Sequence, residues 1–222
     1  MTAAGLDRIF DGQTSFVRRR TLSAGQLLFS LGSPVESVFR VVSGSVRVEI
    51  RPEDGRQLVA CRASCGELIG ADHLTRQFYG VTATVDETTV VDAVGCETVL
   101  KFITKDETLL RKYLDCLTWQ QGKLCESLER ISIQSAQQRV LHLLETLTRR
   151  NGSDSVDLKG RVKSLSYDLN LTHEATYRAL RKLEAEGFIQ RDDGHIRLIR
   201  PQNWCQKQSS HYFGEPDPFA KR

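Results

Sequence analysis

Residues 163–199, which read KSLSYDLNLTHEATYRALRKLEAEGFIQRDDGHIRLI, constrain the fold more than any other stretch of this chain of 222 residues. The pattern predicts a short helix, a turn at Asn170, a second helix that begins after Thr172, and a β-hairpin around Asp193 and Gly194. Asparagine tolerates the left-handed backbone of a tight turn, and threonine is a common helix N-cap. Helix, turn, helix and hairpin in this order predict a winged helix-turn-helix.

The second helix of this motif carries polar side chains at its N-terminal end. In a helix-turn-helix these first residues contact base edges in the major groove. Arg178 can donate two hydrogen bonds to guanine, and Glu174 can accept one from cytosine N4. We expect Ala175, Ala179, Leu180 and Leu183 to face inward. The predicted DNA-binding residues are Thr172, His173, Glu174, Tyr177 and Arg178, with phosphate contacts from Arg181, Lys182, Arg191 and His195.

An alternative is that these polar residues form an ordinary solvated helix face. Glu174 and Arg178 are four residues apart, so they can also form a salt bridge along the helix. The two interpretations are compatible, because one charge can orient the other. The helix cap and the turn at Asn170 favour DNA reading.

A second constraint is an apolar seam in which residues recur at alternating steps of four and three. Such a heptad pattern favours a two-stranded coiled coil, and one polar member lowers stability but helps to fix the register. The alternative is that the seam packs on the chain's own N-terminal domain. We expect dimerisation, because one small domain cannot cover so long a helix. The seam residues are Leu110, Leu114, Leu117, Gln121, Leu124, Leu128 and Ile131.

The first part of the chain, roughly Val17 to Phe102, is strand-like and interrupted by turn signals. Asp54-Gly55 is the strongest local hairpin signal. Many short strands at close spacing predict a barrel or jelly-roll-like domain. The β-prone runs are Leu27–Phe29, Val38–Val42, Val46–Ile50, Leu58–Cys61 and Val81–Val94.

These patterns predict an α+β protein of three parts. Residues 1–106 form a β-rich domain, residues 107–134 a long helix, and residues 135–222 the winged helix-turn-helix domain. Ser135 and Gln138 form a capping box at the start of the third part. Residues 1–132 carry 16 Lys/Arg against 17 Asp/Glu, and residues 133–222 carry 15 against 11. The positive excess therefore lies in the part that would meet phosphates.

Composition excludes several classes of protein. The sequence shows neither an apolar run of membrane-spanning length nor a signal peptide, so we expect a cytoplasmic protein without a membrane partner. Its six cysteines (61, 65, 96, 116, 125, 205) should then be reduced. They form no Cys-x-x-Cys pair, so we expect no structural zinc. No catalytic motif points to an enzyme.

Over about residues 15 to 200 the chain resembles the Crp/Fnr family of transcription regulators. The marks are Gly25–Phe29 with Gly32, Val38–Val46, Gly66–Gly70, Ile131–Val140 and Leu171–Arg178. The resemblance implies an effector-sensing β-roll, a homodimer on palindromic double-stranded DNA, and RNA polymerase as a further partner. It also implies half-sites with a TGA-like or GTG-like core, and an effector that repositions the DNA-binding domains.

The resemblance also locates an effector pocket, in which the chain departs from cyclic-AMP-binding members. Those members hold the phosphate with an Arg-Ser pair, where this chain has Tyr79-Gly80, with Arg76 about three residues earlier. On the long helix their Thr-Ser pair is replaced by Leu124-Cys125. Both departures argue against cyclic AMP. The pocket residues implied by the resemblance are Gly66, Glu67, Leu68, Arg76, Tyr79, Gly80, Leu124 and Cys125.

Other effectors remain open in the sequence. No cysteine precedes Cys61, which argues against an N-terminal iron–sulfur cluster. His73 is the single histidine of residues 1–106 and therefore the one haem-ligand candidate there. The sequence requires no cofactor. Two alternatives are a thiol-redox regulator that uses Cys61 and Cys65 or Cys125, and a ligand-binding module whose winged helix contacts protein.

Overall fold

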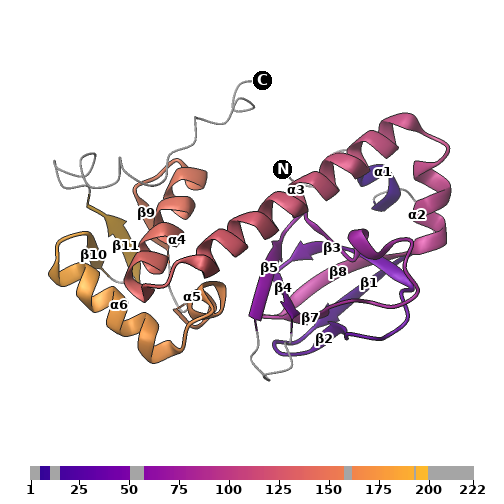
Figure 1. The fold of residues 1–222 in the computed structure, drawn as a ribbon. Helices are drawn as coiled ribbons and strands as arrows, with labels where there is room; N and C mark the ends of the chain where they lie inside the picture. Colours follow the sequence, from indigo (N-terminus) through magenta and orange to yellow (C-terminus); the bar gives the residue numbers. More distant parts are fainter. Residues whose placement is uncertain (1–5, 11–15, 51–57, 158–161, 193, 200–222) are drawn as a thin grey trace.

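The chain is arranged as an N-terminal β domain, a long helix and a smaller C-terminal domain (Figure 1). The structure is a computed structural model that describes residues 6–10, 16–50, 58–157, 162–192 and 194–199. The long helix runs across the β domain and continues to the C-terminal domain, so it connects the two (Figure 1).

Two four-stranded antiparallel sheets form the β domain, with strand orders β1-β8-β3-β6 and β2-β7-β4-β5. Their apolar faces pack against each other, which confirms the prediction of a domain built from many short strands. The strands are β1 (Val17–Leu22), β2 (Leu27–Phe29), β3 (Ser37–Ser43), β4 (Ser45–Ile50), β5 (Leu58–Ser64), β6 (Leu68–Ile69), β7 (Thr82–Val85) and β8 (Thr89–Gly95).

Strands β4 and β5 form the predicted hairpin, with Ser45 opposite Ser64 and Ile50 opposite Leu58. Its expected turn at Asp54-Gly55 lies outside the described residues. The connection from β3 to β4 requires a glycine. Gly44 has φ 84°, and a Cβ there would lie 2.4 Å from Thr89 Oγ1.

The strand-like region is shorter than predicted. Its last part is helix α2 (Cys96–Ile103), and the run Val81–Val94 is divided between β7 and β8. Val99 and Ile103 are buried but Lys101 between them is exposed, so the burial pattern is helical rather than alternating. Two short helical segments were not predicted either, α1 (Asp7–Phe10) and the 3-10 turn η1 (Ala71–His73).

Helix α3 (Glu107–Ser132) starts at Asp106, whose carboxylate accepts hydrogen bonds from Thr108 N and Leu109 N. One face of its N-terminal half is buried on the β domain through Leu109 and Tyr113, and the Tyr113 hydroxyl donates to Ala71 O. These contacts hold the helix on the β domain over several turns.

The C-terminal domain contains the predicted order of helix, turn, helix and hairpin. Asn170 has φ 50°, as the turn requires, and the Ser135 hydroxyl accepts from Gln138 N at 3.4 Å. The hairpin gains a third strand that was not predicted, β9. The elements are α4 (Ala136–Asn151), β9 (Ser155–Asp157), α5 (Val162–Leu169), α6 (His173–Ala185), β10 (Ile189–Asp192) and β11 (His195–Leu198).

Candidate nucleic-acid interface and sensor interior

Helix α6 is polar on one side and buried on the other. The Thr172 hydroxyl caps it by accepting from Ala175 N at 3.1 Å. Thr176, Ala179, Leu180 and Leu183 are buried, whereas Ala175 is half-buried. We call the four exposed residues of its first two turns the reading face. They are His173, Glu174, Tyr177 and Arg178.

The charges on the reading face are held loosely. Glu174 Oε1 lies 3.8 Å from Arg178 Nε, and both side chains are more than 70% exposed. An ion pair this exposed contributes about 0.3–0.5 kcal/mol, so it leaves both groups able to exchange partners. The salt bridge expected as an alternative is thus present only as a weak contact.

His173 is held more firmly than the sequence indicated. Its Nδ1 lies 3.1 Å from the hydroxyl of Ser166 on α5, and its ring meets Tyr167 edge-on at 6.1 Å between centroids. Helix α5 therefore orients the first residue of the reading face. No signal in the sequence of α6 alone identifies these two partners.

The expected phosphate contacts fall into two groups. Arg181 and His195 are exposed, and Lys182 lies 3.9 Å from Glu186. Arg191 is engaged within the domain, because its Nε donates to Glu184 Oε2 at 2.8 Å. The hydrogen bond from Arg191 lowers the pKa of Glu184. Arg191 therefore has a structural partner on α6 that competes with a phosphate.

In the β domain, Glu67 is fully engaged by the chain itself. Its carboxylate accepts from Lys123 Nζ at 2.9 Å, from Ser64 N at 2.7 Å and from Trp119 Nε1 at 3.3 Å. Lys123 and Trp119 belong to α3. The carboxylate therefore fixes the β domain to the long helix and has few lone pairs left for a ribose hydroxyl.

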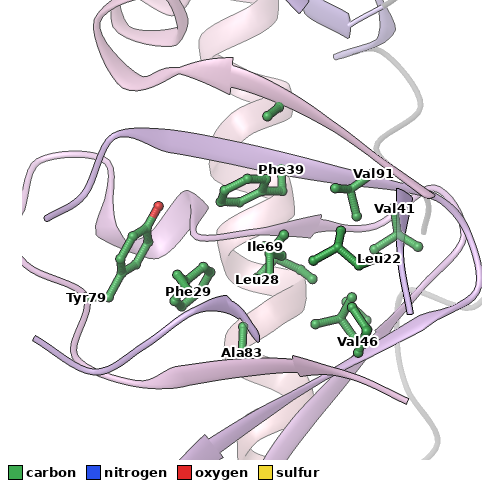
Figure 2. Packing of buried hydrophobic residues seen from close by; sticks show 13 residues of the cluster. Leu22, Leu28, Phe29, Phe39, Val41, Val46, Ile69, Tyr79, Ala83 and Val91 are labelled. Carbon is green, nitrogen blue, oxygen red and sulfur yellow. The ribbon is translucent and has the colours of Figure 1, made fainter. Parts of the chain in front are cut away.

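Tyr79 fills the interior between the two sheets. Its ring stacks on Phe29 at 3.8 Å between centroids, with Phe39 beyond (Figure 2). The hydroxyl donates to Ser37 O at 2.7 Å, and burial raises the pKa of Tyr79 to about 12. The position that carries a phosphate-binding pair in cyclic-AMP-binding members thus carries a neutral aromatic core residue here.

The loop around Tyr79 is held by His73. Gly80 N donates to His73 Nε2 at 2.9 Å, and the buried imidazole packs near the Tyr79 ring. A Cβ at Gly80 would lie 3.3 Å from the same nitrogen. Since this nitrogen accepts a backbone hydrogen bond, His73 here braces the loop. Arg76 in the same loop is exposed.

The remaining residues of the expected pocket lie in different places. Gly66 closes the turn after β5, with its N–H donating to Val41 O, and Leu68 is buried. Leu124 and Cys125 are exposed on α3. The side of α3 toward the β domain carries other residues, among them Gln120, whose amide donates to Leu68 O at 2.8 Å. Within one chain, the expected pocket is thus divided between the sheet interior and the outer side of α3.

The outer side of α3 carries the heptad seam. Leu114 is 52% and Leu128 is 67% exposed, and Leu110, Gln121 and Leu124 are exposed too. Leu117 and Ile131 are half-buried. The exposed members of the seam thus face away from the β domain, whereas Leu117 packs against the core of that domain. The alternative in which the seam packs on the β domain does not hold for its exposed members.

The thiols differ in exposure. Burial raises the pKa of Cys61 to about 11 and that of Cys116 to about 11. Cys65 and Cys125 are exposed, and Cys65 Sγ donates to Val42 O at 3.0 Å. Cys61 is therefore a poor nucleophile at neutral pH.

Within the described residues, no group of three or more His, Cys, Asp or Glu side chains is placed to hold a metal ion. Across the same ranges, none of the helices combines the length and apolar character needed to cross a membrane.

Comparison with known proteins agrees with this architecture. Residues 19–106 match the cyclic nucleotide-binding domain. The chain is 22% identical over 193 residues to the transcriptional activator protein FnrA of Stutzerimonas stutzeri, with 85% of this chain and 79% of FnrA covered. The fold matches that of FixK2 from Bradyrhizobium japonicum with a TM-score of 0.72 at 20% identity, over 90% of this chain and 99% of FixK2. It also matches a Crp/Fnr-family regulator from Eubacterium rectale with a TM-score of 0.62 at 18% identity, over 95% and 96% of the two chains. The chain therefore contains a cyclic nucleotide-binding domain and is similar over most of its length to transcription regulators of the Crp/Fnr family.

Proposed function

We propose that this regulator is a homodimer that reads a palindromic DNA site through α6. The observation that carries the proposal is the reading face, where four residues able to contact bases or phosphates are exposed on a helix whose opposite side is buried. Arginine with guanine and glutamate with cytosine are the base contacts that such a face can make. The elements α5, α6, β10 and β11 then act as a winged helix-turn-helix.

The exposed seam on α3 supports the homodimer. Leu114 and Leu128 lie more than half exposed along one line of a helix whose other side is covered. Burying a leucine side chain contributes about 1.5–3 kcal/mol, so pairing two copies of the seam is strongly favourable. A two-fold axis along α3 would then present two reading faces to half-sites about one helical turn, roughly 34 Å, apart.

We further propose that the sensor domain controls DNA binding without a cyclic nucleotide. A cyclic phosphodiester needs a cation or several N–H donors around it. The sheet interior carries the Tyr79 and Phe29 rings at this place, and Glu67 is already paired with Lys123. Control by an unrelated small ligand remains compatible with this arrangement.

The two alternatives have less support. Thiol control through Cys61 conflicts with its raised pKa and its burial. A winged helix that contacts protein does not account for the charged pair at the reading face, because protein interfaces are generally depleted of charge at their core. The curated relative FnrA is a transcriptional activator, which also favours DNA as the target.

The experiment that tests the proposal is selection of binding sites. The full-length protein is incubated with a pool of random DNA duplexes, with and without reductant, and the bound fraction is sequenced. We expect a palindrome whose half-sites are centred about one helical turn apart. Enrichment of no sequence in either condition would falsify the proposal. A palindrome recovered only with reductant present, or only without it, would favour thiol control.

A further inference from the structure

The turn between α5 and α6 is bound to the sensor domain by a pair of hydrogen bonds. Asn170 Oδ1 accepts from Val59 N at 2.8 Å, and Asn170 Nδ2 donates to Val59 O at 3.3 Å. Strand β5 is an edge strand, so the outward backbone groups of Val59 have no neighbouring strand to pair with. The Asn170 amide replaces that strand, although the two residues are 111 positions apart in the sequence.

A half-buried set of charged side chains crosses the same junction. Arg62 of β5 donates to Asp168 Oδ1 of α5, with Nε at 3.0 Å and Nη2 at 2.9 Å. The same guanidinium also contacts Asp86, and these three side chains are mostly shielded from solvent. Arginine suits this position, because its planar fork can serve two carboxylates at once.

Asp86 also organises a second arginine at the junction. Its Oδ1 accepts from Arg47 Nη1 at 2.6 Å, and the Arg47 guanidinium lies 5.0 Å from the ring centroid of Tyr167 on α5. Asp86 thus holds Arg47 and Arg62, each of which touches α5. Side-chain networks of this kind, when fully paired, fix one arrangement of the elements that they join.

The C-terminal end of α5 is also tied to the end of the long helix and to α4. Arg130 Nε donates to Asp168 O at 3.0 Å. Arg139 Nη1 donates to Leu169 O at 3.0 Å and its Nη2 to Ile133 O at 2.7 Å. Helix α5 is therefore held both by the sensor strands and by the segment that follows α3.

We infer that Asn170, Asp168 and Tyr167, with Val59, Arg62, Arg47 and Asp86 of the sensor domain, form a sensor–reader lock that sets the spacing of the two half-sites. The inference rests on the proposed function, because it assumes that α6 reads DNA in a dimer. None of the lock residues belongs to the reading face, and that face stays exposed while the lock is closed. The lock therefore orients α6 relative to α3 without covering it.

The physical consequence concerns the second half-site. Once one copy of α6 is bound, the other copy meets its half-site at an effective concentration that is highest when the geometry already matches. A rigidly held α6 therefore loses less conformational entropy when the second half-site is bound, which raises affinity at the matching spacing. At other spacings the same rigidity lowers affinity, because α6 cannot adjust. These lock residues determine specificity although they do not contact DNA.

The test uses two variants and a matched control. Asn170→Gly removes both hydrogen bonds to Val59 and keeps a residue that favours the left-handed turn. Arg62→Gln removes the charge that joins Asp168 to Asp86. The control, Arg19→Gln, removes a charge whose partner Asp92 lies within the sensor domain and is also held by Arg40. Thermal unfolding is used to check that each variant is folded.

Binding is measured on the palindrome selected by the wild-type protein and on the same duplex with about five base pairs, half a helical turn, inserted between the half-sites. We expect the insertion to weaken wild type and Arg19→Gln at least about tenfold. For Asn170→Gly and Arg62→Gln we expect about fivefold weaker binding at the selected spacing and less than about threefold further loss on insertion.

Three outcomes overturn the lock as a determinant of spacing. The lock variants could keep the spacing preference of wild type. They could bind the selected duplex more tightly, in which case the contact inhibits DNA binding. They could also lose affinity on both duplexes by the same factor. These results differ from failure of the proposed function, in which the wild-type protein selects no palindrome at all.

Discussion

Two glutamates in this chain occupy opposite settings. The Glu67 side chain is 18% exposed and is hydrogen-bonded by three groups of its own chain, two of which belong to α3. Glu174 is 81% exposed, and its Oε1 lies 3.8 Å from Arg178 Nε. A buried carboxylate must be paired where it lies, whereas an exposed one can exchange water for another partner at little cost. Glu67 therefore belongs to the framework, and Glu174 is available for binding.

The same contrast divides larger parts of the molecule. The interior of the β domain is closed, because Tyr79 and Phe29 fill it and His73 braces the adjacent loop. The reading face and the exposed leucines of the α3 seam are open to solvent. Substitutions in the closed region should thus cost folding stability, and substitutions on the open surfaces should cost assembly or binding.

The largest effect should come from the seam. Leu114→Asp removes two leucines from a dimer and places two carboxylates in their place, which should weaken dimerisation by about 5 kcal/mol. We expect a monomer by sedimentation equilibrium, with an unchanged circular dichroism spectrum. Leu31→Asp is the matched control, because Leu31 is 58% exposed on the β domain and outside the seam. If both variants stay dimeric, the seam is not the interface.

The next largest effect should come from the reading face. Arg178→Ala should cost about 2 kcal/mol for each half-site, or about 4 kcal/mol on a palindrome, which is roughly a thousandfold in affinity. It should also relax selection at the base pair that Arg178 reads. Fluorescence anisotropy on the selected duplex and on single-base variants measures both effects.

Arg181→Ala provides the comparison for Arg178 on the same helix. As a phosphate contact, Arg181 should affect all sequences equally, and its loss should make the dependence of log affinity on log salt shallower by about two for a dimer. If Arg181→Ala lost sequence preference and Arg178→Ala kept it, Arg181 would be the base contact and Arg178 the phosphate contact.

Substitutions in the closed region should lower the free energy of unfolding rather than weaken DNA binding. Tyr79→Ala leaves a cavity beside Phe29 and should lower the free energy of unfolding by about 3 kcal/mol. Tyr79→Phe loses only the hydrogen bond to Ser37 O and should cost about 1 kcal/mol. Urea denaturation measures both variants. Should Tyr79→Ala be as stable as wild type and bind cyclic AMP where wild type does not, the tyrosine occupies a ligand site rather than a core position.

The sequence predicts the open surfaces well, because their signals are local. The seam follows from a heptad count, and the reading face follows from helical periodicity after a capped turn. Thr172 and Asn170 behave as their residue types predict. The long helix, the many-stranded domain and the β4–β5 hairpin could be recognised in the same way.

The closed region could not be predicted, because its contacts join residues far apart in the chain. The motif around Glu67 suggests a free carboxylate, yet Lys123 lies 56 positions later and neutralises it. Tyr79 reads as a departure from a phosphate site, and only its stacking on Phe29 shows what replaces the ligand. In the sequence, the turn alone accounts for Asn170, and its second role toward Val59 has no local signal.

The smallest effect should be seen in the reactivity of the cysteines, some of which lie in the closed region and some on open surfaces. The raised pKa of Cys61 and Cys116, about 11 in each case, follows from burial. At pH 8 such a thiol holds about a hundredfold less thiolate than an ordinary cysteine. Iodoacetamide at pH 8 should therefore modify Cys65 and Cys125 first.

Mass spectrometry of tryptic peptides measures this order, in a protein with Cys205→Ser because Cys205 lies outside the described residues. Protein unfolded in urea is the control, in which all thiols should react alike. The raised pKa values of Cys61 and Cys116 also determine how the free energy of unfolding depends on pH. A thiol that is neutral when folded contributes fully below pH 9 and loses that contribution as the pH rises toward about 11, so the protein should unfold more easily in urea at pH 10 than at pH 8. Rapid modification of Cys61 at pH 8 would show that the interior of the β domain is accessible to solvent. If oxidation of Cys61 also abolished DNA binding, thiol oxidation would be the signal that controls the protein.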